Sequence, residues 1–218
     1  MSSLVKRVYF TNYVFNVYPD VYEPAEDSFI FAENLAVNFG DYVLDMGTGC
    51  GILGIVAAEK ASHVVAVDLN PKAVRCAKEN AKRNKVAAKM SFIQGDLFTP
   101  LSIDTKFDLI LFNAPYLPSE HWEGEAWIER AWAGGVDGRS VLDRFLRDFP
   151  SHLKADGRLL LMQSTYANLE KTFEMLKTQG FKVEIVAEQA APFFETIVLM
   201  EAKANRGCPR HLSLPKSS

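Results

Sequence analysis

The stretch DYVLDMGTGCGILGIVAAEK, residues 41–60, decides the fold. Its first part, DYVLDM, is as apolar as a buried strand requires, and GILGIVAAEK has the composition of a helix. The glycines between them, Gly47, Gly49 and Gly51, let the backbone turn tightly and approach a ligand closely. A strand, a glycine turn and a helix in this order predict an open α/β sheet whose ligand binds beyond the carboxyl ends of the strands.

The remainder of the chain repeats this alternation of strand and helix. Strand-like segments follow at HVVAVDL (63–69), KMSFIQG (89–95), FDLILFN (107–113), GRLLLMQS (157–164), FKVEIVAEQ (181–189) and ETIVLMEAK (195–203). Helix-like segments are EDSFIFAENLAVNF (26–39), PKAVRCAKENAKRNK (71–85), RSVLDRFLRDFPSHL (139–153) and ANLEKTFEMLKTQG (167–180). Alternation of apolar strands with helices is typical of a parallel sheet covered on both faces.

Two local signals refine this pattern. Asn70 as N-cap and Pro71 at the first helical position mark a strong helix start. Too few residues separate the last two strands for a crossover helix, so we expect them to pair antiparallel. The sequence thus predicts a doubly wound, mainly parallel, seven-stranded α/β sheet with an antiparallel last strand.

Size and composition indicate one domain. The chain has 218 residues, of which 48% are hydrophobic, and this is enough for one globular core. We predict a single domain over residues 1–203, made of an N-terminal segment 1–25 and an α/β core 26–203. Residues 204–218 are rich in Pro, Ser, Lys and Arg without periodicity, so we predict a disordered tail.

The net charge and the cysteines restrict the function classes. A formal charge of -3 argues against a protein whose affinity comes mainly from neutralising nucleic-acid phosphates. Cys50, Cys76 and Cys208 are odd in number and irregularly spaced, which indicates neither a disulfide framework nor a metal site. Because we find no signal-peptide core and no apolar run long enough for a bilayer, we expect a cytoplasmic protein without membrane attachment.

Three of the predicted strands lead into a carboxylate: Asp45, Asp68 and Asp96. Asp45 would repel a pyrophosphate and attract a ligand's ammonium group. Asp68 suits the two hydroxyls of a ribose, and Asp96 with the Leu97 backbone is in place to reach an adenine. S-Adenosylmethionine carries such an ammonium group and is the predicted cofactor, although the ribose role of Asp68 is common to NAD and S-adenosylmethionine sites and does not discriminate between them. Two alternatives stay open, since each Asp also suits a turn or helix cap, and residues 49–54 match the GxGxxG fingerprint of NAD sites.

The strand FDLILFN runs into Asn113, Ala114, Pro115 and Tyr116. Pro115 cannot donate to a sheet ladder and pushes Ala114 towards extended geometry, so the strand has to end here. An amide and a phenol group thereby follow a strand end, at the edge of the sheet that also carries the carboxylates. A plain turn built on Asn and Pro is the alternative.

The motifs DMGTGCG, VDLNP, GDLF and FNAPY, in this order and spacing, resemble those of class I S-adenosylmethionine-dependent methyltransferases. VYEPAEDSF (21–29) and AWAGGVDGRSVLDRF (131–145) are similar, more narrowly, to the HemK/PrmC-type glutamine methyltransferases and above all to their short eukaryotic and archaeal branch. The resemblance extends over residues 21–203. It implies the Rossmann-like fold of class I methyltransferases.

The resemblance also implies roles for single residues. Asn113 Oδ1 and the backbone carbonyl of Ala114 would accept the two N–H groups of a substrate amide, and Tyr116 would pack against the amide plane, without a metal. The family carries N-P-P-Y, and Ala114 replaces its first proline; because a carbonyl does not depend on the side chain, we expect activity to survive. Ser28 matches a position whose hydroxyl meets the cofactor, whereas the two acidic residues before it suit an ordinary helix N-terminus.

The predicted site has two parts. The predicted catalytic residues are Asn113, Ala114, Pro115 and Tyr116. The predicted cofactor-binding residues are Ser28, Asp45, Gly47, Gly49, Gly51, Asp68, Asp96, Leu97 and Asn113.

Four functions compete at this point. The resemblance favours methylation of a glutamine side-chain nitrogen, with the Gly-Gly-Gln loop of a class I peptide chain release factor as substrate. An adenine-N6 methyltransferase acting on DNA or RNA is the alternative, because such enzymes use the same motif on an exocyclic NH2 group, although the acidic charge argues against it. A non-catalytic S-adenosylmethionine-binding protein, which Ala114 would favour, and an NAD-dependent oxidoreductase are the remaining hypotheses.

Partners follow from the same resemblance. Longer bacterial relatives hold the release factor with an N-terminal helical domain, and in the short branch a small zinc-binding activator protein covers apolar surface at a sheet edge. KMSFIQ is predicted as that edge strand, with Met90 and Phe92 either facing the partner or packing inward. The loop after NAPY carries Trp122, Trp127 and Trp132, which suit either a lid over a protein substrate or a buried loop core.

Overall fold

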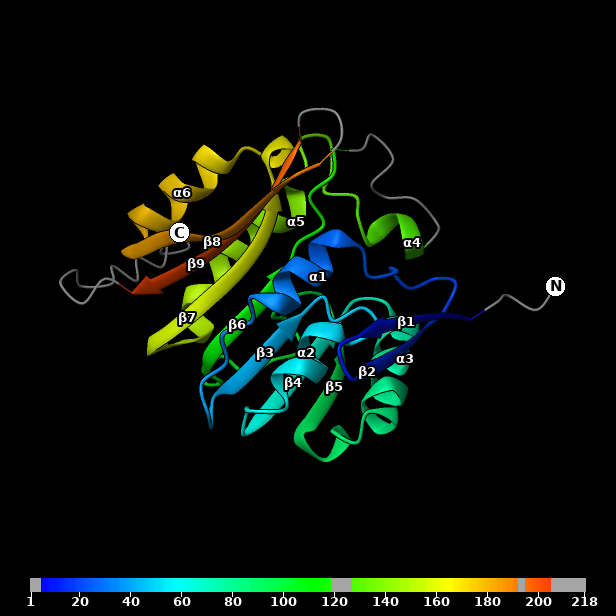
Figure 1. Ribbon diagram of the computed structural model, residues 1–218. Helices are drawn as coiled ribbons and strands as arrows, with labels where there is room; N and C mark the ends of the chain where they lie inside the picture. Colours follow the sequence, from blue (N-terminus) through cyan, green and yellow to red (C-terminus); the bar gives the residue numbers. More distant parts are fainter. Residues whose placement is uncertain (1–4, 119–126, 192–194, 205–218) are drawn as a thin grey trace.

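The computed structural model describes residues 5–118, 127–191 and 195–204. These form a seven-stranded sheet with the strand order β5-β4-β3-β6-β7-β9-β8 and a separate two-stranded hairpin (Figure 1). The strands of the sheet are β3 (Tyr42–Met46), β4 (His63–Asp68), β5 (Met90–Gln94), β6 (Phe107–Asn113), β7 (Leu153–Ser164), β8 (Phe181–Ala190) and β9 (Thr196–Ala204). The α-helices are α1 (Glu26–Glu33), α2 (Ile52–Ala57), α3 (Pro71–Arg83), α4 (Trp127–Arg130), α5 (Ser140–Asp148) and α6 (Leu169–Thr178).

The sheet has the predicted mixture of strand directions. β3 pairs parallel with β4 and with β6, and the parallel ladder continues to β5 on one side and to β7 on the other. β9 pairs antiparallel with both β7 and β8, which confirms the predicted reversal of the last strand. The chain first builds outward from β3 to β5 and then resumes at β6, so β3 and β6 flank the point where the strand order reverses. Ligands of open α/β sheets bind at this point.

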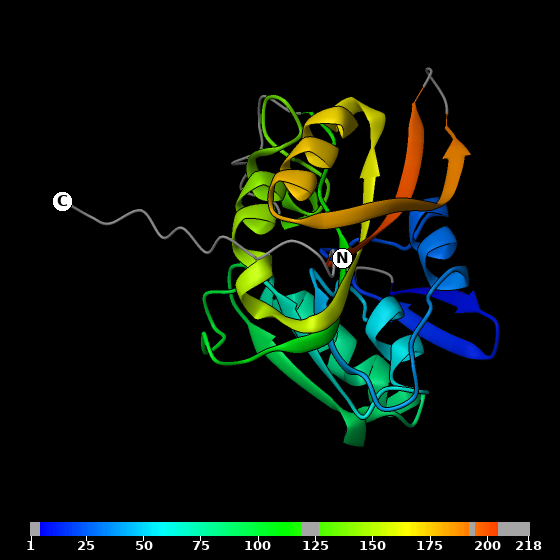
Figure 2. The ribbon, with the colours of Figure 1, turned by 90° about the vertical axis from the view of Figure 1, so that its left-hand side faces the viewer.

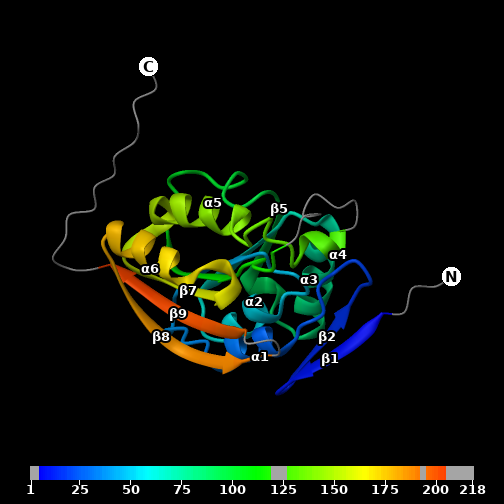
Figure 3. The same cartoon turned by 90° about the horizontal axis from the view of Figure 1, so that it is seen from above.

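Helices cover both faces of the sheet because its strands are apolar on both sides. Alternate residues of β3 separate accordingly, with Val43 in the core under α1, α2 and α3 and Leu44 in the core under α5 and α6. Figure 2 shows α5 and α6 on one side of the sheet and α1 with the hairpin on the other, and Figure 3 gives the same separation from above.

Helix boundaries follow local signals where these are strong. Asn70 Oδ1 accepts from the backbone N–H of Lys72 at 2.9 Å, which confirms the predicted start of α3. The predicted helix over 26–39 was too long, since α1 ends at Glu33. Asn34 Nδ2 bonds back to the carbonyl of Ile30, and the backbone beyond Asn34 is not helical, with Val37 buried in the core and Phe39 93% exposed.

The N-terminal hairpin was not predicted. Its strands are β1 (Lys6–Phe10) and β2 (Tyr13–Val17), and they pair with each other rather than with the sheet. The outer edge of β2 is occupied by two asparagines of α3: Asn84 exchanges two hydrogen bonds with the Val14 backbone, at 3.0 and 2.9 Å, and Asn80 exchanges two with the Asn16 backbone, at 2.9 and 2.8 Å. Residues four apart in a helix rise by about 6 Å, and residues two apart in a strand by about 6.8 Å. The two amides therefore imitate a neighbouring strand.

The edges and ends of the domain bear on two further expectations. β5 lies at an edge of the sheet as predicted, but Met90 is 7% exposed and Phe92 packs against the same core cluster, so the inward alternative holds. β9 ends at Ala204, which was predicted as the first residue of the tail, and residues 205–218 of that predicted tail lie outside the described residues. In the described ranges, no helix is both long and apolar enough to cross a membrane.

Candidate active site

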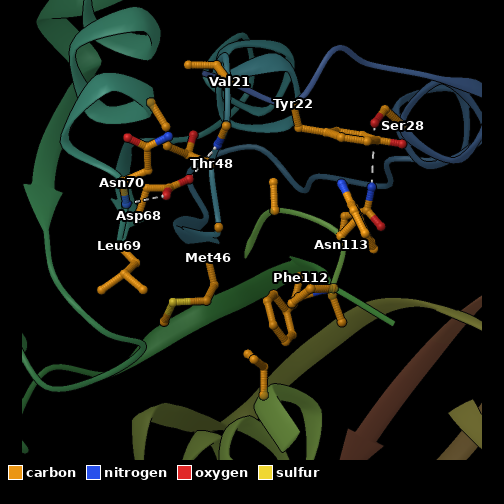
Figure 4. A pocket seen from close by; sticks show the side chains of 18 of the residues that line it. Val21, Tyr22, Ser28, Met46, Thr48, Asp68, Leu69, Asn70, Phe112 and Asn113 are labelled. Carbon is orange, nitrogen blue, oxygen red and sulfur yellow. Dashed lines mark hydrogen bonds between the residues drawn. The ribbon is translucent and has the colours of Figure 1, made fainter. Parts of the chain in front are cut away.

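A cavity of about 870 Å³ opens at the carboxyl ends of β3, β4, β5 and β6. Its volume lies in the range usual for small-molecule sites. Asp68, Leu69 and Asn70 lie at one end of it and Tyr22, Ser28 and Asn113 at the other, with Met46 and Phe112 between them (Figure 4). The cavity is therefore one continuous space with two chemically different ends.

The glycine turn forms part of the wall at the Asp68 end. Gly47, Gly49 and Gly51 all have positive φ, at 67°, 56° and 91°, so L side chains are disfavoured at each of them. A Cβ on Gly51 would lie 3.1 Å from the Cβ of Ala77, and Gly51 therefore also allows α3 to pack closely. The turn is held in place because Thr48 N donates to the carbonyl of Val67 at 3.0 Å.

Two of the predicted cofactor residues lie behind the wall of the cavity, namely Asp45 and Gly51, neither of which lines it. Asp45 is 1% exposed and accepts hydrogen bonds from Thr48 Oγ1 at 2.5 Å and from Gly54 N at 3.0 Å. Burial raises the pKa of Asp45 from its ordinary 3.8 to about 7. The expectation that this carboxylate faces a ligand's ammonium group is corrected, because its hydrogen bonds come from Thr48 of the glycine loop and from Gly54 of α2 instead.

Asp68 lines the cavity as predicted. Its Oδ1 accepts from Asn70 N at 2.8 Å and its Oδ2 from Gly49 N at 2.9 Å, and burial raises its pKa. Each carboxylate oxygen has two lone pairs, so both can accept a further hydroxyl. Because Asp68 already uses the Gly49 N–H, the loop does not present that donor to a phosphate, which argues against a dinucleotide site.

Asp96 and Leu97 lie on the rim beyond β5, also as predicted. Leu97 adopts a left-handed backbone conformation, with φ at 48°, and Asp96 forms an ion pair with Arg144 of α5. Among the described residues that line the cavity, Arg144 is the only lysine or arginine, against the carboxylates Asp27, Asp68 and Asp96. The lining is thus acidic, and it favours a cationic ligand over a polyphosphate.

Asn113 ends β6 at the other end of the cavity. Its Nδ2 donates to Asp27 Oδ2 at 2.8 Å and approaches Ser28 Oγ at 3.5 Å. Its Oδ1 is buried and has no hydrogen-bond partner among the described residues. A buried acceptor left unpaired costs about 1–3 kcal/mol, so an acceptor of this kind in a cavity wall points to a ligand donor.

Ala114, Pro115 and Tyr116 continue the wall from Asn113, so the structure brings the predicted catalytic residues together. Ala114 N approaches the carbonyl of Met162 on the neighbouring strand at 3.4 Å. Tyr116 is buried, and burial raises the pKa of its phenol above the ordinary value of 10.0, so the hydroxyl keeps its proton as a donor.

Sequence reasoning missed Asp27, which lies between these groups. It is 4% exposed and lines the cavity, and its carboxylate accepts from Tyr22 OH at 3.2 Å, Ser28 N at 2.7 Å and Tyr116 OH at 3.4 Å in addition to Asn113. Its place in the first turn of α1 suggested a favourable interaction with the helix dipole. The motif VYEPAEDSF was the available signal, but Asn113 is 86 residues away and only the fold brings them together.

The segment after NAPY packs against this end of the site. Leu117 N donates to the carbonyl of Trp132 at 3.0 Å, and Gly134 N donates to the carbonyl of Leu117 at 2.8 Å. A Cβ on Gly138 would collide with the carbonyl oxygen of Tyr116. Trp127 and Trp132 line the cavity, whereas Trp122 lies outside the described residues.

Comparison with known proteins gives consistent results. The Methyltransferase small domain family matches residues 23–131. A Methanocaldococcus jannaschii protein, named as a candidate protein N5-glutamine methyltransferase, is 45% identical over 84% of this chain and 92% of its own length. The release factor glutamine methyltransferase of Bacillus cereus is 32% identical over 78% of this chain, but over only 59% of its own length.

A solved structure supports the fold. The E. cuniculi Mtq2-Trm112 complex, described as responsible for the methylation of the translation termination factor eRF1, superposes with a TM-score of 0.67 and 23% identity. The match covers 85% of this chain and 99% of the matched chain. At this identity the likeness concerns the fold, and it confirms the predicted Rossmann-like architecture.

Proposed function

The chain belongs to the Methyltransferase small domain family and to its HemK/PrmC-type glutamine methyltransferases, and we propose that it methylates the side-chain nitrogen of a protein glutamine. The proposed substrate is the Gly-Gly-Gln loop of a class I peptide chain release factor. The names of the relatives support this choice, since they include a release factor glutamine methyltransferase and a complex that methylates eRF1.

One observation carries the proposal: the unpaired, buried Oδ1 of Asn113 in the cavity wall. A primary amide has two N–H donors and a planar shape. Asn113 Oδ1 would accept one of these donors and the backbone carbonyl of Ala114 the other. The group that satisfies this wall is thus an NH2 group on a flat carrier, as in a glutamine side chain.

The chemistry of an amide explains why two acceptors are needed. The nitrogen lone pair is delocalised into the carbonyl, so the amide is a poor nucleophile and the rate has to come mainly from orientation. Holding two reacting groups in the right geometry can lower a barrier by about 7–11 kcal/mol. In this proposal Asn113 and Ala114 fix the direction of the nitrogen, while the buried ring of Tyr116 restricts the amide plane and excludes water.

The acidic lining fits S-adenosylmethionine, whose ammonium and sulfonium groups are positive. The glycine loop would contact the cofactor with its backbone, Asp68 would accept the ribose hydroxyls, and Asp96 with the Leu97 backbone would meet the adenine. Ser28 would contact it from the side of α1. When bound, S-adenosylmethionine supplies a methyl group on a positively charged sulfur. Asp45 would act indirectly, by holding the glycine loop through Thr48 and Gly54.

We also propose that a small activator protein pairs with the edge of β5. Support comes from the position of β5 at the sheet edge and from the partner protein named in the Mtq2-Trm112 complex. Because Met90 and Phe92 pack inward, the partner would bind through backbone hydrogen bonds and not through these side chains. We expect the chain and a zinc-binding protein of this type to elute together in gel filtration after co-expression. Separate elution would contradict this part.

A methylation assay with labelled S-adenosylmethionine tests the main proposal. The protein is incubated with release factor, with release factor whose Gly-Gly-Gln glutamine is replaced by glutamate, and with DNA or RNA. Label on the intact release factor alone, located by mass spectrometry on the glutamine, is expected. Label only in nucleic acid would instead favour the adenine-N6 alternative. Transfer to none of the three would contradict catalysis on these substrates.

A further inference from the structure

We propose that Asp27 is a positioning residue that fixes which end of the Asn113 amide faces the substrate. The inference rests on the proposed function, since it assigns Asp27 a part in recognising the NH2 group. It starts from an ambiguity of the asparagine side chain. An amide carries a donor end and an acceptor end of nearly equal shape, and only its surroundings determine which end points into a cavity.

The contacts of Asn113 remove this ambiguity. Its Nδ2 donates to Asp27 Oδ2 at 2.8 Å, and a carboxylate only accepts hydrogen bonds. Turning the amide by half a rotation would bring its oxygen against that carboxylate oxygen, and two acceptors repel each other. Asp27 therefore holds the Nδ2 end and leaves Oδ1, the atom without a partner, for the substrate.

Asp27 can impose this orientation because its own rotation is fixed. Tyr22 OH, Ser28 N and Ser28 Oγ all donate to Oδ1 of Asp27, at 3.2, 2.7 and 3.2 Å, and Tyr116 OH reaches Oδ2 at 3.4 Å. Figure 4 shows Tyr22 and Ser28 next to Asn113 at this end of the pocket. The donors come from the segment before α1, from α1 itself and from the strand-end motif, so the carboxylate links three separate parts of the chain.

The inference predicts selectivity as well as rate. A wall with an unpaired Oδ1 accepts a hydrogen bond from an amide or amino NH2 group, and it repels the carboxylate of a glutamate in the same position. With the Nδ2 end of Asn113 in that place, the wall would favour the carboxylate instead. Asp27 thus contributes to the choice between a glutamine and a glutamate side chain without contacting either.

Asp27→Asn is the first test. The introduced amide has a donor end that can bond to Asn113 Oδ1, so the reversed orientation of the Asn113 amide is no longer repelled. We therefore expect kcat on the release factor to fall about 100-fold. The Kd for S-adenosylmethionine should stay within about threefold, because Asp27 acts on Asn113. Glu26→Gln is the matched control: it makes the same chemical change one residue earlier, at an exposed position, and should leave both quantities unchanged.

A reciprocal exchange separates positioning from a purely structural role. Asn113→Asp alone faces two carboxylates towards each other and should be nearly inactive. Combining it with Asp27→Asn restores one donor opposite one acceptor and still leaves an acceptor for the substrate. We expect the double variant to be at least about tenfold more active than Asn113→Asp, as for residues coupled by direct contact.

Two results would overturn the inference: a kcat of Asp27→Asn within threefold of wild type, or no gain from the double exchange in protein that melts and binds cofactor normally. Failure of the proposed function is a different result, because then the wild type itself does not methylate the release factor. In that case the NMR signals of the Asn113 side-chain NH2 replace the assay. They should shift in Asp27→Asn and stay unchanged in Glu26→Gln, and unchanged signals in both variants would also overturn the inference.

Discussion

The two ends of the cavity are built in opposite ways. At the cofactor end, the glycine turn and Asp68 come from one short stretch of chain, and their polar groups already bond to each other. At the substrate end, Asp27, Asn113 and Tyr116 come from distant segments, and the Asn113 oxygen is left unpaired. The cofactor end is therefore held together by its own hydrogen bonds, whereas the substrate end has one acceptor available for a ligand donor.

This difference indicates how each end of the cavity recognises its ligand. At the cofactor end the polar groups of the glycine turn and Asp68 bond to one another, so they fix the shape of the backbone surface there. At the substrate end the Asn113 oxygen has no hydrogen-bond partner, so this end selects a ligand that brings a donor. Changes at the substrate end should affect turnover, and changes at the cofactor end should affect cofactor affinity and stability.

The largest effect is expected from Asn113→Ala, which removes this acceptor. We predict a fall in kcat of about 100- to 1000-fold, as for loss of a well-placed polar group in other active sites, with a much smaller rise in cofactor Kd, since Asn113 is also a predicted cofactor residue. Steady-state kinetics and calorimetric titration measure the two quantities. Asn12→Ala, in the exposed hairpin turn, is the control and should behave as wild type. If Asn113→Ala lowered the affinity for S-adenosylmethionine and left kcat unchanged, the proposed difference between the two ends would be wrong.

Asp68→Asn should produce the next largest effect, on affinity. Hydrogen bonds to a charged group contribute about 1.5–3 kcal/mol, so we predict that the Kd for S-adenosylmethionine rises about 10- to 100-fold. At saturating cofactor, kcat should fall much less. Asp104→Asn is the control, because it makes the same charge change at an exposed position outside the cavity, and it should leave the Kd unchanged. Unchanged affinity in the Asp68 variant would remove this residue from the cofactor site.

A pH effect on the free energy of unfolding is expected from Asp45. Its pKa is about 7 in the folded protein against an ordinary 3.8, so the folded state holds a proton that the unfolded chain has released. The stabilising contribution is complete below about pH 4 and is lost as the pH rises through about 7. Asp45→Asn should therefore show a smaller decrease in the free energy of unfolding between pH 4 and pH 8 than wild type, as measured by denaturant titration. If the free energy of unfolding fell equally with pH in the variant and in wild type, the argument that burial raises the pKa of Asp45 would be contradicted.

The smallest effect should come from Ala114→Pro, which restores the proline of the related motif. The Ala114 N–H forms only a long contact with Met162, at 3.4 Å, so its loss costs little. A proline also restricts the unfolded chain, which contributes about 0.4–1 kcal/mol where the backbone conformation suits it. We predict activity within about threefold of wild type. A much larger loss would indicate that the backbone at this position is specific to alanine.

The contrast between the ends also explains what could be predicted from the sequence. The order of strands and helices, the glycine turn and the start of α3 at Asn70 depend on neighbouring residues, and the prediction was right for each. The hairpin was missed because its stability depends on Asn80 and Asn84, which are 64 and 70 residues away from their partners. Asp27 was missed for the same reason.

Asp45 illustrates a different limit. Its position after a strand was predicted correctly, but a side chain at a strand end can point towards a ligand or back under the loop. Thr48 and Gly54 decide the direction, because their donors lie on the loop side. Sequence spacing fixes where a residue lies along a strand, and it leaves open which of two nearby donor sets the side chain meets.

The strand-like pair of asparagines on α3 sets a constraint on how this sequence can change in length. Each residue of a helix turns its face by about 100°. One residue inserted or deleted between Pro71 and Asn80 would rotate both amides away from β2 and remove four hydrogen bonds at once. Insertions and deletions should therefore be avoided in the first part of α3, even at its solvent-facing positions.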